Sequence, residues 1–574
     1  MRRWIHCGRG LAALSCLLIY GAIAPRAIAN DQSTPTSTWA LTPILEYISA
    51  SWNNLTRSMS DCNSVADPKI TVRPLLYLPA GFPVTPALQK LHADCDVDIE
   101  HLPKAIHQLG EIELSTIHTH GLLYLPNKYV VPGGRFNEMY GWDSYFIILG
   151  LLRDGRIDLA RGMVENFFFE VEHYGAVLNA NRTYYLTRSQ PPFLSSMVLA
   201  VYQAERKTGH AGRDWLKRAY PYLAKDYSMW TQEPHLAGST GLARYYDFGD
   251  GPPPEAVQDE NAFYRKVIDY FVVHPEDADH DLVEETGELL QRQAPAAYGS
   301  AYNVTVCDIP MTKGSPECEP PHPVRLGADY YKGDRAVRES GFDISFRFGA
   351  YGAATHRYAP DCLNSLLYKT EMDMEQISEE LGKKSEAKIW KDRAHARRNR
   401  IQQYLWDQQT GFFFDYQFET GTRSAYRYLT TFYPLWAELA TPEQAAAVEK
   451  NVTVFEQPGG LAMSTVKSGA QWDYPYGWAP VELLAVEGLR HYGFNTDADR
   501  ISYKFLSMVL QNFRRDNTIR EKYNVVTRSS ETPVEVGYQQ NVIGFGWTNA
   551  AFLELLHDLP KSEVDRLNRV VSVP

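Results

Sequence analysis

The stretch PGGRFNEMYGWDSYF, from Pro132 to Phe146, holds two carboxylates, one arginine, three glycines and five aromatic residues. Glycine lets a backbone turn closely around a ligand, and aromatic faces beside charged groups suit a ligand with both apolar faces and hydroxyl groups. The stretch therefore predicts a sugar-binding loop that leads into a helix near Asp143. Similar aromatic, glycine-rich loops recur along the chain between helical segments, and this alternation indicates the fold.

The segments between these loops have the apolar periodicity of helices. DLARGMVENFFFEVEHYG, Asp158 to Gly175, begins at an acidic residue and ends at glycine, as helix caps do. Alternating apolar and polar strand patterns are scarce, which predicts an all-α protein of about a dozen helices. The other main helical segments are PFLSSMVLAVYQAERKTGH, RDWLKRAYPYLAKDYSMW, the long run from Glu371 to Asp407, PVELLAVEGLRHYG, DADRISYKFLSMVLQNFRRD and TNAAFLELLHDL.

Composition and charge narrow the class of protein. Apolar residues make up 44% and charged residues 22% of the 574 residues, which is typical of a folded globular chain. The net charge of -12 argues against a nucleic-acid partner, because nucleic-acid binders need a basic surface. We therefore expect no nucleic-acid partner, and the sugar-binding loop predicts a small-molecule partner instead.

The N-terminus has the pattern of a secretory signal. Basic residues precede the apolar run LAALSCLLIYGAIA (11–24), and AIA (27–29) offers a cleavage site. This predicts a signal peptide over 1–29, export to the periplasm or extracellular space, and no stable membrane insertion after cleavage. A retained anchor is an alternative, although the run is shorter than the roughly 20 residues of a spanning helix. Lipidation at Cys16 is less favoured because the apolar run continues past it.

After the signal we expect a polar linker over 30–41 and one catalytic domain over 42–574. A long, Pro-rich and charged segment at about 256–337 is interpreted as an insertion in that domain. Export would permit disulfides, and Cys307–Cys318 is the first candidate pair, followed by Cys62–Cys95. No cysteine or histidine cluster has convincing ligand spacing, so no metal site is expected.

Four carboxylates lie beside aromatic and glycine residues. Glycoside hydrolysis needs one protonated carboxyl that gives a proton to the leaving oxygen and one ionised carboxylate that activates water. Each such residue alone is more often a helix cap or a partner of backbone amides. Their similar contexts favour an acidic hydrolase of a polar, ring-shaped ligand, without deciding which pair reacts. The four are Asp143, Asp343, Asp473 and Glu521.

The motifs carry a resemblance to a known family. PGGRFNEMYGWDSYF and QWDYPYGWAP resemble the two signature segments of the trehalases, glycoside hydrolase family 37. NANRTYYLTRSQPPF, RESGFD, EKYN and GFGWTN follow in that family's order, so that the resemblance covers roughly Leu122 to Leu556. It implies an (α/α)6 toroid, a six-hairpin glycosidase-like barrel with site-forming loops at one end. It also implies hydrolysis of α,α-trehalose to two glucose molecules with inversion.

The resemblance assigns roles to individual residues. Asp343 of SGFD matches the general acid, and Glu521 of EKYN matches the general base. Trp472 is expected to pack on a sugar ring. The remaining implied substrate contacts are Arg135, Trp142, Asp143, Asn179, Arg188, Ser189, Gln190, Glu255, Arg338, Gly341 and Glu535.

The chain also departs from the family pattern. Pro253-Pro254-Glu255 stands where many bacterial members carry Arg-Pro-Glu, so one arginine contact is missing, and Arg338 is a candidate substitute. This region is more similar to the fungal neutral trehalases. TRSSETPVEVGYQQNVI, from Thr527 to Ile543, replaces the usual glycine run, which leaves the lid contact and the place of Glu535 open.

We therefore expect a monomeric inverting trehalase that needs no cofactor or metal. An inverting hydrolase of another α-glucoside on the same toroid is one alternative. A trehalose-binding protein without catalysis is a second alternative, which the presence of both Asp343 and Glu521 disfavours.

Overall fold

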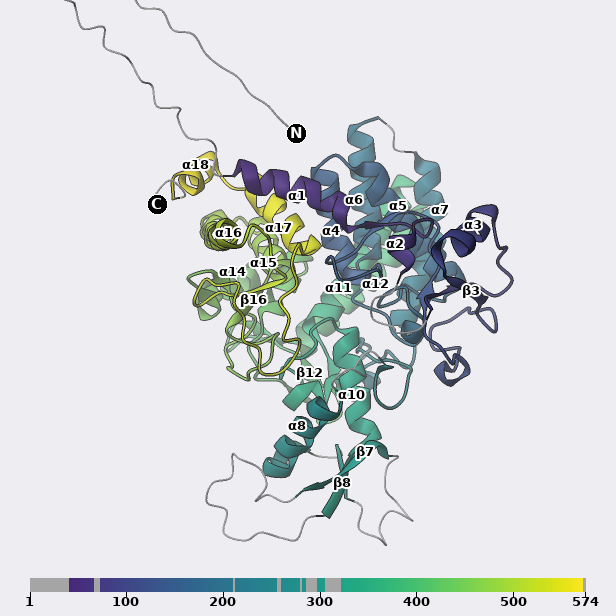
Figure 1. The fold of residues 1–574 in the computed structure, drawn as a ribbon. Coiled ribbons are helices and arrows are strands. Elements are labelled where there is room, and N and C mark those ends of the chain that lie inside the picture. The colour runs from purple at the N-terminus through teal and green to yellow at the C-terminus, as the bar shows by residue number, and fades with distance from the viewer. Residues whose placement is uncertain are drawn as a thin grey trace, which may run out of the picture. The chain divides into compact units, whose positions relative to one another are not determined.

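The fold was analysed in a computed structural model (Figure 1). It describes residues 41–66, 73–209, 212–254, 260–278, 281–284, 297–304 and 322–570. The expected signal peptide, nearly all of the expected linker, Glu255, Cys307 and Cys318 lie outside these ranges.

Six helices pack in a closed circuit. Each of them contacts the next, and the last one, α17, packs against the first, α4. The contact between α4 and α17 is close, because a side chain at Gly150 would come within 2.7 Å of Cβ of Ala550. The six are α4 (Gly141–Arg153), α6 (Leu194–Lys207), α11 (Asp361–Glu380), α13 (Tyr433–Trp436), α15 (Ala479–His491) and α17 (Gly546–His557).

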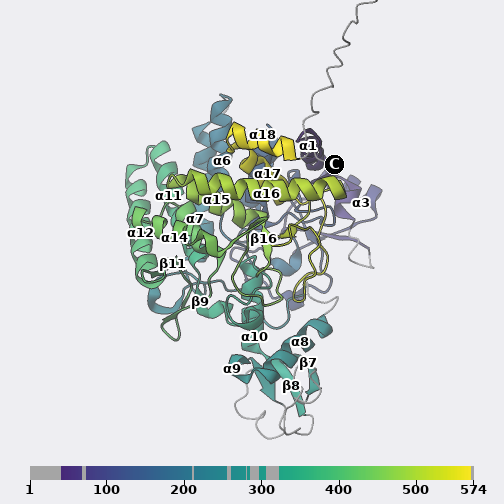
Figure 2. The same ribbon diagram turned by 90° about the vertical axis from the view of Figure 1, so that its left-hand side faces the viewer.

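A second set of helices covers this inner circuit. α5 packs on α4 and α6, α7 on α6 and α11, α12 on α11, α16 on α15 and α17, and α1 on α17. Figure 2 shows α16 running along α15. α16 buries one stripe that includes Ile501, Phe505 and Met508, as expected of an outer helix, whereas α15 is buried on nearly all sides. The outer helices are α1 (Thr42–Leu55), α5 (Ile157–His173), α7 (Arg213–Trp230), α12 (Lys384–Tyr404) and α16 (Asn495–Asp516).

The double circuit confirms the all-α prediction and places the chain in the (α/α)6 toroid class. The long helical run expected from Glu371 to Asp407 is divided between α11 and α12, because Gly382 turns the chain with a φ of +74°.

Short elements complete the ring. β2 (Leu75–Leu78), β3 (Asp98–His101) and β4 (Leu122–Leu123) form a parallel sheet near the N-terminal side of the domain. Cys62 and Cys95 form a disulfide, the second of the two expected pairs, whereas Cys362 is buried and free. The other elements are α2 (Cys62–Val65), α3 (Pro86–Cys95), α14 (Pro442–Lys450), α18 (Lys561–Val570), β1 (Thr56–Arg57), β5 (Tyr129–Val130), β9 (Tyr358–Ala359), β10 (Trp406–Asp407), β11 (Phe412–Phe413), β12 (Tyr416–Gln417), β13 (Thr422–Arg423), β14 (Glu456–Gln457), β15 (Gly460–Leu461), β16 (Tyr476–Trp478) and β17 (Lys522–Asn524).

The segment expected to be an insertion has its own small core. Strands β6, β8 and β7 form an antiparallel sheet in that order, and α8 packs on it. The apolar side of α8 shares a core with Ile344, Ala470 and Val536, which come from three loops of the helical ring. Figures 1 and 2 show α8 and the strands at the far end of α10, which leads back to the helical ring. The elements of the segment are α8 (Glu260–Val273), α9 (Pro275–Ala278), β6 (Leu282–Glu284), β7 (Ala297–Val304), β8 (His322–Gly327) and α10 (Ala328–Glu339).

Across the described ranges, none of the helices combines the length and the apolar character that crossing a bilayer requires.

A buried ion network fixes the irregular segment between α10 and α11. The Arg347 guanidinium is 0% exposed and binds the Asp415 carboxylate through Nε at 2.7 Å and Nη2 at 2.5 Å. The same Nη2 atom lies 2.6 Å from Oδ1 of Asp361, the first residue of α11. Because this charge is fully desolvated, it depends on these two carboxylates for compensation, and the Arg347 Nη1 atom also donates to Cys362 Sγ at 3.6 Å.

Replacing Arg347 with methionine should lower the free energy of unfolding by about 3–5 kcal/mol, because two buried carboxylates lose their shared cation. Urea denaturation followed by circular dichroism measures the change. The control is Arg423→Met, which breaks the Arg423–Asp407 pair of a partly exposed arginine; it should cost less than about 1 kcal/mol. Equal losses of unfolding free energy in the two variants would show that the buried network contributes no more to stability than the surface pair does.

Candidate active site

The loops predicted to form the site run into the N-terminal ends of inner helices. Asp143 lies in the first turn of α4, and Asp343 precedes α11. Glu521 precedes α17 and adjoins β17, which pairs with β16 so that Lys522 stands opposite Trp478. This pairing brings the QWD loop, which precedes β16, beside the Glu521 loop. Residues far apart in the chain therefore meet at one end of the ring.

Three of the four candidate carboxyls influence one another electrostatically. Burial raises the pKa of Asp143 well above its usual range, and the negative charges of Glu521 and Asp343 raise it further. Asp143 is only 4% exposed. A carboxyl that is kept neutral can donate a hydrogen bond as well as accept one, which suits contact with a hydroxyl group.

Asp343 is partly buried and has the environment of a proton donor. Burial raises the pKa of Asp343 to about 6, against the opposing effects of the Arg338 and Arg188 charges and a hydrogen bond from Tyr538. The Tyr538 hydroxyl donates to Asp343 Oδ2 at 2.7 Å. A carboxyl with a pKa near 6 is protonated in part close to neutral pH, as a general acid requires.

Glu521 is placed differently. Its side chain is buried and forms an ion pair with Lys522, whose Nζ lies 3.3 Å from Glu521 Oε2. Its backbone is fixed on both sides: its N–H donates to the Val542 carbonyl at 3.0 Å, and its carbonyl accepts from the Trp547 indole at 3.3 Å. The Glu521 loop is thus tied to the segment that enters α17.

The fourth candidate, Asp473, has a structural role. Its carboxylate accepts hydrogen bonds from the hydroxyls of Ser345 at 3.0 Å and Ser468 at 2.6 Å, and from the Phe346 N–H at 2.9 Å. Asp473 is fully buried by these partners. It therefore holds the loop that carries Asp343, in agreement with the alternative of a carboxylate that binds backbone amides.

The polar residues before α6 are held by hydrogen bonds to one another and to neighbouring helices. Arg188 Nε donates to Asn179 Oδ1 at 2.8 Å. The Ser189 N–H donates to Glu339 Oε1 at 3.2 Å, and Gln190 Oε1 accepts from the Trp142 N–H at 3.0 Å. These contacts connect the loop before α6 to the start of α4 and to the end of α10. They hold four expected substrate contacts in fixed positions, and these four, called the α6 wall below, are Asn179, Arg188, Ser189 and Gln190.

Arg188 shares a carboxylate with an arginine that the motifs did not single out. Asp247 Oδ2 lies 3.5 Å from Arg188 Nη1 and 3.0 Å from Arg335 Nη1. Arg335 also donates to the carbonyls of Asp250, Gly251 and Pro252. Arg335 thus holds the turn that leads to the Pro-Pro-Glu segment. Arg338, one turn along α10, pairs with Asp334 at 3.2 Å.

The tryptophans expected at the site belong to a buried aromatic cluster. Trp472 is 2% exposed and stacks on Trp478, with ring centroids 3.7 Å apart. Trp142 contacts Trp472 and Trp547 at 5.9 and 5.6 Å. Gly341 passes so close to Trp142 that a Cβ there would lie 2.9 Å from its ring. One face of Trp472 is therefore already occupied by Trp478.

Two expected contacts lie at the surface. The exposed Arg135 guanidinium lies over the Phe136 ring, 4.5 Å from its centroid. Glu535 is exposed and binds Gly469 through its backbone N–H, at 3.2 Å. The structure thus brings Asp143, Asp343, Glu521 and the α6 wall together, whereas Arg135 and Glu535 lie at the edge.

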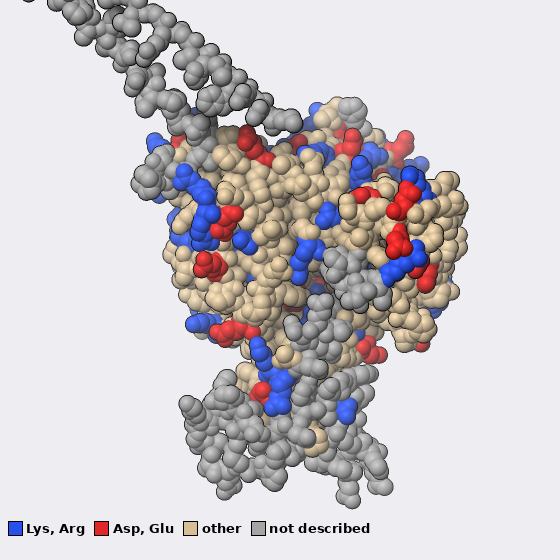
Figure 3. Space-filling model, in the orientation of Figure 1, with Lys and Arg blue, Asp and Glu red and all other residues tan. Residues whose placement is uncertain are grey.

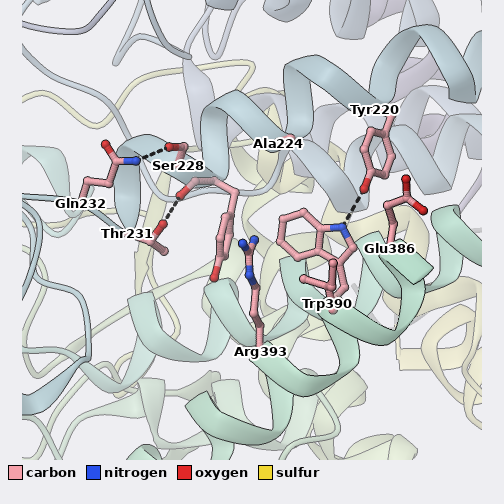
Figure 4. A pocket seen from close by; sticks show the side chains of 10 residues that line it. Tyr220, Ala224, Ser228, Thr231, Gln232, Glu386, Trp390 and Arg393 are labelled. Carbon is pink, nitrogen blue, oxygen red and sulfur yellow. Dashed lines mark hydrogen bonds between the residues drawn. The ribbon is translucent and has the colours of Figure 1, made fainter. Parts of the chain in front are cut away.

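A groove on the outer surface is separate from these loops. It has a volume of about 650 Å³, lies between α7 and α12, and is lined by none of the expected site residues (Figure 4). Its polar groups largely bind within its own walls: the Gln232 amide donates to Ser228, and the Trp390 indole donates to Tyr220. The second of these contacts joins the two outer helices.

Basic and acidic residues are interspersed on the face shown in Figure 3, and the described part of that face carries no continuous basic stripe. No group of three or more His, Cys, Asp or Glu residues is arranged to hold a metal ion within the described ranges.

Comparison with known proteins shows which family and which individual proteins this chain resembles. Residues 83–284 and 324–560 match the family model of trehalase. The cytosolic neutral trehalase of Saccharomyces cerevisiae is 38% identical over 564 residues, which cover 88% of this chain and 69% of the relative. The cytosolic neutral trehalase of Neurospora crassa is 35% identical, with 88% and 71% coverage. The solved structure of the Saccharomyces cerevisiae neutral trehalase matches with a TM-score of 0.73 and 34% identity, over 93% of this chain and 96% of that one.

These relatives correct the expected location. Export to the periplasm or extracellular space was expected from the N-terminal pattern, but the relatives are named cytosolic neutral trehalases, which contradicts it. The expectation rested on a compositional pattern alone, a basic cluster followed by a short apolar run, and this pattern lies outside the described residues.

The family match covers both motif regions, from the Pro132 loop to the segment that enters α17. The relatives and the solved structure extend over most of the chain, and the (α/α)6 ring accords with them. The chain belongs to the trehalase family.

Proposed function

We propose that the chain hydrolyses α,α-trehalose to two glucose molecules with inversion, with Asp343 as the general acid and Glu521 as the general base. Family membership and the neutral trehalase relatives support the substrate and the hydrolysis. The observation that carries the assignment is the contrast between the two carboxyls. Asp343 has a pKa raised to about 6, and Glu521 is ion-paired with Lys522.

In the proposed reaction, neutral Asp343 gives its proton to the glycosidic oxygen as the bond to the anomeric carbon breaks. Glu521 removes a proton from a water molecule, and this water attacks the anomeric carbon from the opposite face. The two carboxyls should stand roughly 6.5–9.5 Å apart, so that water fits between Glu521 and the sugar. The product glucose then has the β configuration, whereas the leaving glucose keeps the α configuration.

The substrate contacts are proposed from the same region. Arg188, Arg338 and neutral Asp143 would bind sugar hydroxyls, because arginine donates in a fixed fork and a neutral carboxyl can donate or accept. The contacts of Arg188 with Asn179 and Asp247 support this role, since they hold the guanidinium in one orientation.

We also propose a single catalytic domain over 42–574 with the insertion at about 256–337. The core that α8 shares with Ile344, Ala470 and Val536 supports a role for this insertion in bracing the acid loop. We further propose that the chain acts as a monomer.

Asp343→Asn and Glu521→Gln should each lower kcat by about 10³-fold or more, because neither amide can give or take the required proton. Glucose release from trehalose measures the effect, and circular dichroism checks the fold. The matched control is Asp565→Asn, which changes an exposed carboxylate in a surface pair with Lys561; its kcat should stay unchanged. Full activity in either site variant would remove that residue from the mechanism.

Gly341→Ala should lower kcat/KM by about 10²-fold, because a Cβ at this position clashes with Trp142 and displaces Asp343 two residues away. The control is Gly349→Ala. Gly349 also has a positive φ, +82°, but its Cβ would lie 3.7 Å from the nearest atom. Both substitutions therefore strain the backbone, and only Gly341→Ala also creates a clash. Steady-state kinetics measure kcat/KM in both variants, and an equal loss of kcat/KM in the two would contradict the importance of the Trp142 contact.

A further inference from the structure

Gln471 joins the acid, the neighbour of the base, and the segment from Thr527 to Ile543. Its side-chain N–H donates to the backbone carbonyl of Asp343. Its Oε1 atom accepts from Lys522 Nζ and from the Tyr538 N–H, both at 3.2 Å. No motif assigned a role to Gln471, although it directly precedes Trp472. The residue therefore fixes the backbone of Tyr538 against the loop that carries Asp343.

Tyr538 has an unusual combination of exposure and contact. The residue is 42% exposed, one of few large apolar or aromatic residues that the described surface presents so openly. Its hydroxyl nevertheless donates to Asp343 Oδ2 at 2.7 Å rather than only to solvent. Two bonds, one from the backbone to Gln471 and one from the hydroxyl to Asp343, thus hold an exposed side chain over the proposed acid.

The contact has a consequence for the proton. A neutral carboxyl has one oxygen that carries the proton and one that only accepts hydrogen bonds. Because Oδ2 accepts from the Tyr538 hydroxyl, the proton of neutral Asp343 is directed to Oδ1. A general acid works only when its proton faces the leaving oxygen. The oxygen of Asp343 that carries the proton therefore decides whether the proton can reach the glycosidic oxygen.

We propose that Tyr538 is a positioning residue for the acid step: its hydroxyl fixes which oxygen of Asp343 carries the proton while the 527–543 segment lies over the site. This rests on the proposed role of Asp343 as general acid. Tyr538 itself transfers no proton in the reaction, and Gln471 holds its backbone for this task.

The pH dependence follows from the groups that face Asp343. Arg338 of α10, Arg188 of the α6 loop and the Tyr538 hydroxyl favour its ionised form, whereas burial favours its neutral form. Asp143 of α4 faces it as a further carboxyl. Removing the hydroxyl deletes one influence that lowers the pKa of Asp343. The pKa then rises, and the acid stays protonated to higher pH.

The chain offers a matched control for the experiment. The Tyr476 hydroxyl donates to the Pro533 carbonyl at 2.6 Å and so anchors the same segment without touching Asp343. Tyr476→Phe removes a hydroxyl that binds this segment from outside, and Tyr538→Phe removes a hydroxyl that belongs to the segment itself. Only the second change removes the bond to the acid.

The test measures kcat, KM and the pH profile of kcat/KM for trehalose in the wild type, Tyr538→Phe and Tyr476→Phe. For Tyr538→Phe we expect kcat about tenfold lower with KM little changed. We also expect the basic limb of the profile to move up by about one pH unit. For Tyr476→Phe the basic limb should stay in place. An unmoved basic limb in Tyr538→Phe, or equal shifts in both variants, would overturn the proposal.

Asp343→Asn is measured in parallel so that the two claims fail separately. If Asp343→Asn is inactive and Tyr538→Phe keeps the wild-type profile, the acid assignment stands and the positioning role is wrong. If Asp343→Asn is fully active, the acid assignment fails, and the positioning role of Tyr538 fails with it.

Discussion

The buried charge of Arg347 is the constraint on which the proposed acid depends. Asp343 lies on a segment between α10 and α11 that has only two short 3-10 turns and strand β9 as regular structure, so side-chain contacts must hold much of it in place. Arg347, four residues further on, binds Asp361 at the start of α11 and Asp415. Asp473 binds Ser345 and the Phe346 N–H between them. A buried ion pair adds little net stability, but it strongly disfavours any arrangement that leaves its charges unpaired.

The closed ring of helices gives the site its other constraint. Because every site loop enters the N-terminal end of an inner helix, residues separated by hundreds of positions meet at one end. Burial there raises the pKa of Asp343 and Asp143, whereas Glu521 has the Lys522 cation beside it. These different surroundings of Asp343 and Glu521 support the opposed roles of acid and base that we propose for them.

The sequence predicted the parts of this protein that follow local rules. The 3.6-residue periodicity and capping of Asp158 to Gly175 predicted α5, and the family motifs identified Asp343 and Glu521 as the proposed pair. The role of Asp473 was not predictable, because its aromatic neighbours resemble those of a catalytic carboxyl, and only its partners in space distinguish it. The stacking of Trp472 on Trp478 was not predictable either, because no local pattern shows which ring will face Trp472 in the folded chain.

Gln471 and Tyr538 were missed for a related reason. Tyr538 lies in the segment that departs from the family pattern, so no motif covers it, and its contact with Asp343 spans 195 positions in the chain. The strands of the insertion were missed because the segment is charged and rich in proline, which hides a two-residue alternation. Local patterns predict helices and motifs, whereas long-range side-chain contacts require the folded chain.

The central claim is that trehalose is hydrolysed with inversion by one acid and one base. Proton NMR of a fresh trehalose hydrolysate, recorded before the glucose anomers interconvert, tests it most directly. The account predicts equal amounts of α-glucose and β-glucose in the first spectra. Two molecules of α-glucose for each trehalose cleaved would show retention, and would contradict the assignment of Glu521 as a base that activates water.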